Sequence, residues 1–315
     1  MTAAELHDRF RAEVGKVIVG QDEAVRLSAI ALTVGGHILL EGVPGVAKTL
    51  LAKSIARVLS LQYSRVQFTP DLMPADIVGT AIYDLEARAF RTRKGPVFTN
   101  ILLADEINRA PAKVQSALLE AMEERGVTLE GQQMALPSPF MVLATQNPVE
   151  YEGTYPLPEA QQDRFLFKVI LDYPGYEAEV EVLRRWDRGL DLRDPAQAGV
   201  EPIVGGSELN EVQREIRSVT VDEDIKRYIV ALAINTRQAP ELALGASPRA
   251  EVLVMLASKA SAAFDGRHYV TPDDIKGLIR PAFRHRLILR PESEVAGVSA
   301  DSILDGIISR VPPPR

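Results

Sequence analysis

Short apolar segments alternate with helical patterns along the first half of the chain. Five segments have the length and composition of buried strands, at residues 38–40, 64–69, 101–104, 140–145 and 166–171. Amphipathic patterns over 48–59 and 112–125 lie between them, and Gly126 ends the second. This alternation is typical of an α/β fold with a mostly parallel sheet.

The second half of the chain has a different pattern. Strand signals stop near Glu177, and residues 187–207 are rich in Gly, Pro and charge, which indicates a loop. Helical patterns follow over 222–238 and 248–264, and a third begins at Thr271 with Pro and two acids in its first turn. We predict a core domain over 1–175, a linker over 176–206 and a smaller helical domain over 207–315, with a frayed tail at 311–315.

Composition excludes several classes of protein. The 315 residues are 46% hydrophobic and 25% charged, which disfavours disorder and coiled coil. The net charge of −7 disfavours a nucleic-acid binder driven by phosphate contacts. The absence of Cys excludes disulfides and thiolate chemistry, and four His leave little material for a zinc site. No apolar run approaches the ~18 residues of a membrane span. The charged start lacks a signal segment, so we expect a cytoplasmic protein.

A glycine-rich loop carries the strongest local signal. It runs from Gly42 to Lys48 and Thr49, after an apolar strand and before a helix, which is the context that a phosphate-binding loop requires. Its backbone N–H groups and the helix dipole would hold phosphate, Lys48 would neutralise charge, and Thr49 would offer a hydroxyl to Mg²⁺. Ala47 occupies the usual Gly position before the lysine. The alternative is an ordinary Gly-rich turn before a helix.

Polar residues end two later strands. Asp105 and Glu106 follow the apolar segment 101–104, and Asn147 follows the segment 140–145. Ligands bind at the carboxyl ends of parallel strands, so Asp105 would face Mg²⁺ and Glu106 would polarise the attacking water. Asn147 would orient that water. Each feature alone is also compatible with an ordinary strand end; together with the loop, they predict nucleotide hydrolysis.

The combination resembles the AAA+ ATPases, and among them the MoxR family. The strings that carry the resemblance are VGQ at 19–21, GVPGVAKT at 42–49, DEINRAP at 105–111, ATQNP at 144–148, LPEAQQDRF at 157–165 and SPR at 247–249. The resemblance covers roughly residues 10–290, and the Ala47 departure looks usual for the family. It implies a P-loop AAA+ core with a parallel sheet flanked by helices, followed by a smaller all-α lid domain.

The resemblance also implies a role for each matching residue. Val19 and Gly20 would line the adenine pocket, and Asn147 matches sensor 1. Arg164 matches the arginine finger that reaches a neighbouring subunit's nucleotide, and Arg249 matches sensor 2 on the lid. The nucleotide-binding set is completed by Gly42, Val43, Pro44, Gly45, Val46, Ala47, Lys48, Thr49, Leu50 and Asp105, with Thr49 and Asp105 as Mg²⁺ ligands and Glu106 as the catalytic carboxylate that activates the water.

Other charged groups have simpler interpretations. Arg164 is equally compatible with a surface ion pair to Asp163 or Glu159, and Arg249 with a weak contact at a helix start. We interpret the basic residues within 88–94 and the triplet 284–286 as solvated surface. Residues 70–98 resemble the helix-2 insert of this AAA+ branch, and residues 127–139 are predicted to form a hairpin.

The function predicted is that of a MoxR-type ATPase that binds ATP or ADP with Mg²⁺ between subunits of a hexameric ring. It would remodel a protein partner, and the family implies one with a von Willebrand factor A domain. We expect no nucleic-acid partner and no membrane segment. The alternatives are a nucleic-acid motor or loader, and a nucleotide-gated scaffold with little turnover.

Overall fold

A five-stranded parallel sheet forms the centre of the structure, a computed structural model that describes residues 1–84, 88–129, 131–147 and 155–314. Its strand order is β2-β5-β8-β1-β9, and every neighbouring pair is parallel. The strands are β1 (Ile38–Gly42), β2 (Tyr63–Gln67), β5 (Ile101–Asp105), β8 (Met141–Gln146) and β9 (Phe167–Leu171). Each overlaps a strand predicted from the apolar segments, so the α/β prediction is confirmed.

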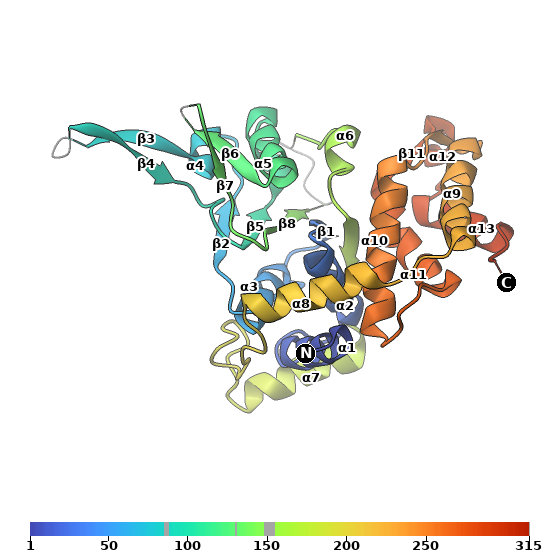
Figure 1. Ribbon diagram of the computed structural model, residues 1–315, viewed down its shortest axis with the longest axis horizontal. Helices are drawn as coiled ribbons and strands as arrows, with labels where there is room; N and C mark the ends of the chain where they lie inside the picture. The colour runs from blue at the N-terminus through green and yellow to red at the C-terminus, as the bar shows by residue number, and fades with distance from the viewer. Residues whose placement is uncertain (85–87, 130, 148–154, 315) are drawn as a thin grey trace.

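Both faces of the sheet are buried at its centre, which explains why β1, β5 and β8 are apolar runs. Alternate residues of β5 enter different apolar clusters, with Leu103 on one face and Leu102 on the other. The first face is covered by α1 (Ala3–Val14), α2 (Asp22–Val34), α3 (Lys48–Val58) and α8 (Gly206–Ser218), and the second by α4 (Pro74–Val78) and α5 (Ala112–Glu124) (Figure 1).

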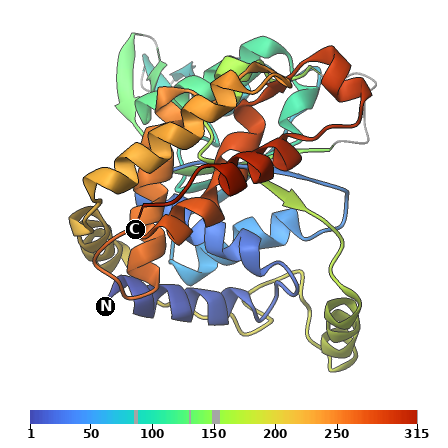
Figure 2. The same cartoon turned by 90° about the vertical axis from the view of Figure 1, so that its right-hand side faces the viewer.

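The predicted linker over 176–206 is not a linker at its start. Residues Tyr176–Asp187 form helix α7, and only the segment between α7 and α8 lacks regular structure. Arg185 Nη1 donates to the carbonyl oxygens of Gly15 (2.8 Å) and Lys16 (2.6 Å), which anchors α7 to the end of α1. Figure 2 shows α7 at the lower right, beyond the end of β9.

The C-terminal part is helical, as predicted. It contains α9 (Glu223–Gln238), α10 (Pro248–Phe264), α11 (Pro272–Phe283), α12 (Pro291–Val295) and α13 (Ala300–Arg310), with a short ladder of β10 (Leu242–Leu244) and β11 (Ile288–Leu289). One apolar cluster extends from the sheet through α1 and α2 into α9, α10 and α11. The helical part therefore shares a core with the sheet. Val311 is buried, so fraying can begin only after it.

Two hairpins project from the side of the sheet where β2 lies (Figure 1). One pairs β3 (Gly79–Asp84) with β4 (Ala89–Lys94), and the other pairs β6 (Gly126–Leu129) with β7 (Gln132–Ala135). The hairpin predicted at 127–139 is thus confirmed in its described residues. Short helical segments complete the fold: η1 (Ile107–Arg109), α6 (Glu159–Gln162) and η2 (Arg284–Arg286). Within the described ranges, no helix has the length and apolar character of a membrane span.

Candidate functional site

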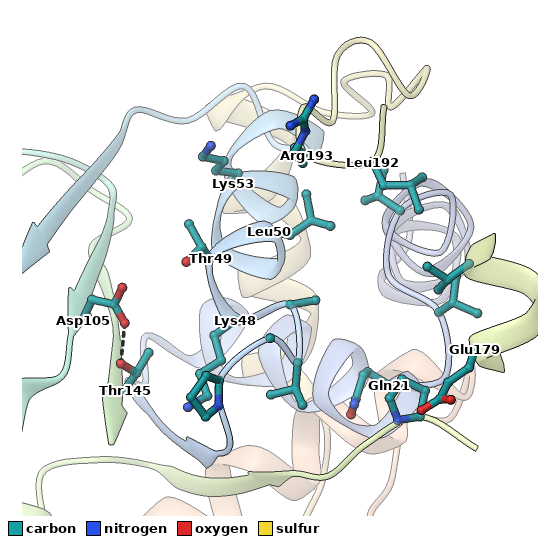
Figure 3. A pocket seen from close by; sticks show the side chains of 18 of the residues that line it. Gln21, Lys48, Thr49, Leu50, Lys53, Asp105, Thr145, Glu179, Leu192 and Arg193 are labelled. Atoms are coloured by element: carbon teal, nitrogen blue, oxygen red, sulfur yellow. Dashed lines mark hydrogen bonds between the residues drawn. The ribbon is translucent and has the colours of Figure 1, made fainter. Parts of the chain in front are cut away.

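A cavity of about 760 Å³ opens at the carboxyl ends of β1, β5 and β8. Figure 3 shows its lining side chains, which come from the loop after β1, the start of α3, the ends of β5 and β8, and the segment around α7. The sequence-predicted residues that line it are Val19, Pro44, Gly45, Val46, Ala47, Lys48, Thr49, Leu50, Asp105, Glu106 and Asn147. Residues scattered over more than a hundred positions therefore meet at one edge of the sheet.

The loop after β1 turns sharply into α3. Gly45 has φ 89° and Ala47 has φ 64°, both in the left-handed region. Ala47 is the residue that caps α3, so the methyl group noted in the sequence sits in a conformation that glycine adopts more easily. Lys48 and Thr49, the first residues of α3, line the cavity, and the N-terminus of a helix favours an anion.

Lys48 points back along the loop. Its Nζ donates to the carbonyl oxygen of Gly42 and to that of Gln146 (3.3 Å), which joins the ends of β1 and β8. Partial burial lowers the pKa of Lys48, and the carboxylates of Asp105 and Glu106 oppose that shift. The ammonium group thus lies between a phosphate loop and two acids.

Asp105 ends β5 and is held by two neighbours. Thr145 Oγ1 donates to Asp105 Oδ1 (2.6 Å), and Arg65 Nη2 donates to Asp105 Oδ2 (2.7 Å). Thr145 Oγ1 also accepts the N–H of Glu106 (2.8 Å), so one buried hydroxyl orients both acids. The sequence offered only its place at the end of a strand as a signal for Thr145.

Glu106 has a strained backbone and a supported carboxylate. Its φ of 56° is in the left-handed region, which a residue with a Cβ adopts at an energetic cost. Gln67 Nε2 donates to Glu106 Oε2 (2.8 Å), and Arg109 Nε lies 3.2 Å from the same oxygen. Asn147 is buried beside these groups at the end of β8.

A second wall of the cavity is apolar and was missed by sequence analysis. Val182, Leu183 and Trp186 of α7 face Val17 and Val19 across it. The remaining unpredicted lining residues are Gln21, Lys53, Thr145, Pro174, Glu179, Leu192 and Arg193. The apolar residues of α7 stand among many charges, and that contrast was the available signal. Such a wall can pack against the flat face of a nucleobase.

Three predicted residues shape the cavity without lining it. Gly20 has φ 75°, and a Cβ built there would lie 2.8 Å from the Cβ of Ala178 in α7. Gly42 supplies the carbonyl oxygen that Lys48 contacts, and its Cβ position is occupied by the Leu171 carbonyl oxygen. Val43 packs against the main apolar cluster.

Arg164 and Arg249 lie outside the cavity but beside each other. Arg164 Nε is 3.0 Å from Glu123 Oε2, and Arg249 Nη1 is 3.2 Å from Glu123 Oε1. The carboxylate of α5 therefore gathers two guanidinium groups from segments far apart in sequence. The ion pairs considered for Arg164 with Asp163 or Glu159 are replaced by this one.

The triplet 284–286 corrects our interpretation of it as solvated surface. His285 and Arg286 are buried, and only Arg284 is partly accessible. Arg286 Nε donates to Asp163 Oδ1 (2.6 Å), and its Nη2 donates to the carbonyl oxygens of Asp163 (2.9 Å) and Phe165 (2.7 Å). A charged triplet looks solvated in sequence because its partners lie on a distant segment.

The donor set near the phosphate loop fits Mg²⁺. Thr49 offers a hydroxyl and Asp105 a carboxylate, and both face the cavity in Figure 3. Mg²⁺ prefers such oxygen ligands and takes few from protein, leaving places for phosphate and water. Among the described residues, no cluster of three or more His, Asp or Glu has the arrangement of an all-protein metal site.

Comparisons with known proteins agree with this geometry. The model of the ATPase family associated with various cellular activities (AAA) matches residues 37–167, and an AAA lid domain model matches 234–307. The chain is 45% identical to Chaperone MoxR1 of Mycobacterium tuberculosis, covering 99% of this chain and 84% of that protein. It is 32% identical to Protein MoxR of Methylorubrum extorquens, covering 97% and 94%. The chain belongs to the MoxR family of AAA+ ATPases.

A solved structure supports the MoxR-family fold independently. A Cytophaga hutchinsonii protein assigned as an ATPase superposes with a TM-score of 0.90 at 44% identity, covering 99% of this chain and 97% of that one. The relatives, the family models and this structure together confirm the resemblance seen in the sequence strings. Nucleotide binding and ATPase activity are properties of the AAA+ family.

Proposed function

We propose that this chain binds ATP with Mg²⁺ in the cavity at the strand ends and hydrolyses it to ADP and phosphate. The observation that carries the proposal is the convergence of Lys48, Asp105 and Glu106 on one cavity that also has an apolar wall. A cavity of about 760 Å³ is of the size that small-molecule sites have.

The residues divide the chemistry among them. Lys48 and the N–H groups of α3 neutralise the β- and γ-phosphates, and Thr49 with Asp105 holds Mg²⁺, which supplies charge neutralisation when bound. Glu106 accepts a proton from a water whose oxygen attacks the γ-phosphorus, while the bond to the β–γ bridging oxygen breaks. Asn147 orients that water. Gln67 and Arg109 fix the Glu106 carboxylate for this step.

A second copy of the chain is part of the proposal. Arg164 does not line the cavity of its own chain and pairs with Glu123, so any nucleotide that it contacts would be one held by a neighbour, in exchange for that ion pair. A homo-oligomeric ring, hexameric in our expectation, brings each Arg164 to the adjoining cavity. We infer that the cycle drives remodelling of a protein partner in the cytoplasm, one with a von Willebrand factor A domain. The chaperone name of the M. tuberculosis relative supports the remodelling role.

Two substitutions test the active site. Lys48→Ala is expected to weaken binding of a fluorescent ATP analogue at least tenfold, because the phosphate charge loses its nearest cation. Glu106→Gln is expected to keep that affinity and to lower the steady-state rate of phosphate release by about a hundredfold or more. Unchanged affinity in Lys48→Ala, or normal turnover in Glu106→Gln, would refute the assignment of these roles.

Mixed assemblies test the role of the neighbour. Glu106→Gln subunits lack the acid and Arg164→Ala subunits lack the finger, so a mixture contains interfaces that hold both wild-type groups. Such a mixture should recover part of the activity that each variant lacks alone. A rate that is independent of protein concentration, with no recovery on mixing, would contradict action between subunits.

The alternative functions give different results. A nucleic-acid motor would hydrolyse ATP faster with added DNA or RNA, and that stimulation would fall steeply with salt. A nucleotide-gated scaffold would bind ATP and show the same negligible turnover in wild type and in Glu106→Gln. Co-purification with the ATP-loaded Glu106→Gln variant would reveal the partner of a remodeller.

A further inference from the structure

Asp163 connects α6, η2 and the start of α10, the three elements that surround Arg164 and Arg249. It directly precedes Arg164 and follows α6. Its carboxylate accepts a hydrogen bond from Arg286 Nε (2.6 Å) and others from Ser247 Oγ (3.1 and 3.2 Å). The segment that carries Arg164 is thereby attached to η2 and to the start of α10.

Ser247 extends this connection to Arg249. It caps α10, accepting the N–H of Ala250 (3.2 Å) while donating to Asp163, and Arg249 lies in the first turn of the same helix. The Asp163 carboxylate therefore contributes to the placement of both Arg164 and Arg249. Their guanidinium groups also converge on the two oxygens of Glu123.

The connection is buried at its Arg286 end. The Arg286 side chain is 2% exposed, and four backbone carbonyl oxygens, of Ala282, Asp163, Phe165 and Leu166, accept its remaining N–H groups. Burial lowers the pKa of Arg286, and the Asp163 carboxylate opposes that shift. Separating a buried ion pair leaves an uncompensated charge, which is strongly unfavourable. His285 adds a contact from its Nε2 to the Phe165 carbonyl oxygen (3.1 Å).

We propose that Asp163, through Arg286 and Ser247, is a positioning residue that holds Arg164 and Arg249 as one unit for a phosphate group presented by a second copy of the chain. This inference rests on the proposed function. Glu123 carries one negative charge and two guanidinium partners, so one positive charge stays uncompensated within the trio. A terminal phosphate carries more charge and more acceptor oxygens than a carboxylate, and it can engage both guanidinium groups at once.

Hydrolysis kinetics of the full-length chain test the proposal. Asp163→Asn keeps the size of the side chain and removes its charge, and it should lower kcat about tenfold to a hundredfold, the effect of a displaced positioning group. KM and the affinity for a fluorescent ATP analogue in dilute protein should change by less than about twofold, because the chain's own cavity is untouched.

A gentler variant covers the case in which Asp163→Asn fails to fold. Ser247→Ala keeps the buried pair and removes only the hydroxyl that joins Asp163 to α10. Its matched control is Ser299→Ala, since Ser299 caps α13 by accepting the N–H of Ser302 (3.1 Å) and its hydrogen bonds stay within the first turn of that helix. Both should lose a similar free energy of unfolding, about 1 kcal/mol. Only Ser247→Ala should lower kcat, by about threefold to tenfold.

A variant lacking both arginines separates positioning from general stability. If Asp163 acts through Arg164 and Arg249, then adding Asp163→Asn to Arg164→Ala/Arg249→Ala should change the residual kcat by less than about twofold. A further tenfold loss, or equal kcat in Ser247→Ala and Ser299→Ala, overturns the inference and leaves the proposed function standing. Wild-type kcat in Arg164→Ala/Arg249→Ala overturns the inter-subunit role of the arginines and this inference with it.

Discussion

Replacing Gly20 by Ala probes how α7 is seated against the nucleotide cavity. Gly20 has φ 75°, and an added Cβ would lie 2.8 Å from the Cβ of Ala178 and 3.1 Å from that of Pro174. Neither neighbour can rotate away, because one is the first atom of an alanine side chain and the other belongs to a ring. The start of α7 must therefore move outward, and the cavity wall moves with it.

The loss in the free energy of unfolding of Gly20→Ala has two separate contributions. The left-handed backbone costs about 1–2 kcal/mol for a residue with a Cβ, and the smaller entropy of the unfolded chain returns about 0.4–1 kcal/mol. Forcing atoms into packed space adds about 1–3 kcal/mol. We expect Gly20→Ala to lower the free energy of unfolding by about 2–4 kcal/mol. Loss of contacts to the displaced wall should weaken ATP binding by about fivefold, equivalent to about 1 kcal/mol.

Gly266→Ala is the matched control. Gly266 has φ 72°, and a Cβ there would meet nothing within 4 Å. Gly266→Ala should lower the free energy of unfolding by about 1 kcal/mol, the cost of the left-handed backbone alone, and keep the ATP affinity of the wild type. Urea unfolding followed by circular dichroism and titration with a fluorescent ATP analogue measure both quantities. Equal ATP affinity in the two variants would refute the role of Gly20 in seating the α7 wall.

Three other substitutions test separate features of the structure. Ala47→Gly removes a methyl from a left-handed residue at φ 64° and should raise the free energy of unfolding by up to about 1 kcal/mol, whereas a loss in urea unfolding would show that no strain is present. His37 is fully buried, and burial lowers its pKa in the folded protein to about 3. As the pH falls below the ordinary histidine pKa, His37 is protonated in the unfolded chain but not in the folded one, and the folded state loses stability. This residue should make the protein about 2 kcal/mol less stable at pH 5 than at pH 7. Thermal melts of His37→Gln should show a loss of stability between these pH values that is smaller by that amount. Asp163→Ala leaves the Arg286 side chain, which is 2% exposed, without its carboxylate and should cost about 3–5 kcal/mol in urea unfolding, while a loss under 1 kcal/mol would mean that the backbone carbonyl oxygens alone compensate the Arg286 charge.

The parts of the fold that sequence reasoning predicted are those with a local signal. The central strands β1, β5 and β8 are buried on both faces, so each is an apolar run that can be identified without knowing its neighbours. The edge strands β2 and β9 contain polar residues and are only partly buried. The glycine-rich loop is equally local, because its glycines, its lysine and the start of α3 follow one another along the chain. Asp105, Glu106 and Asn147 were found because strand ends in a parallel sheet share one edge.

The apolar wall of the cavity was not predicted from the sequence. Val182, Leu183 and Trp186 stand on a helix rich in charge, in a segment that we predicted to be a linker. Helix α7 is amphipathic, yet it buries none of its side chains fully. An amphipathic pattern alone does not tell whether the apolar side of a helix faces a core or a cavity. Its apolar residues face a cavity instead of a core, and only the tertiary structure shows that cavity.

The sequence by itself determined the P-loop core, the helical C-terminal part and the position of the acids at the strand ends, because each depends on residues that are adjacent or periodic along the chain. The tertiary structure decided the surroundings of the arginines. Arg286 and Asp163 are 123 residues apart, and Glu123 joins Arg164 to Arg249 across two further segments. Whether a charged side chain is solvated or buried depends on the partner that compensates its charge, and that partner is set by packing between elements, which the order of residues along the chain does not display.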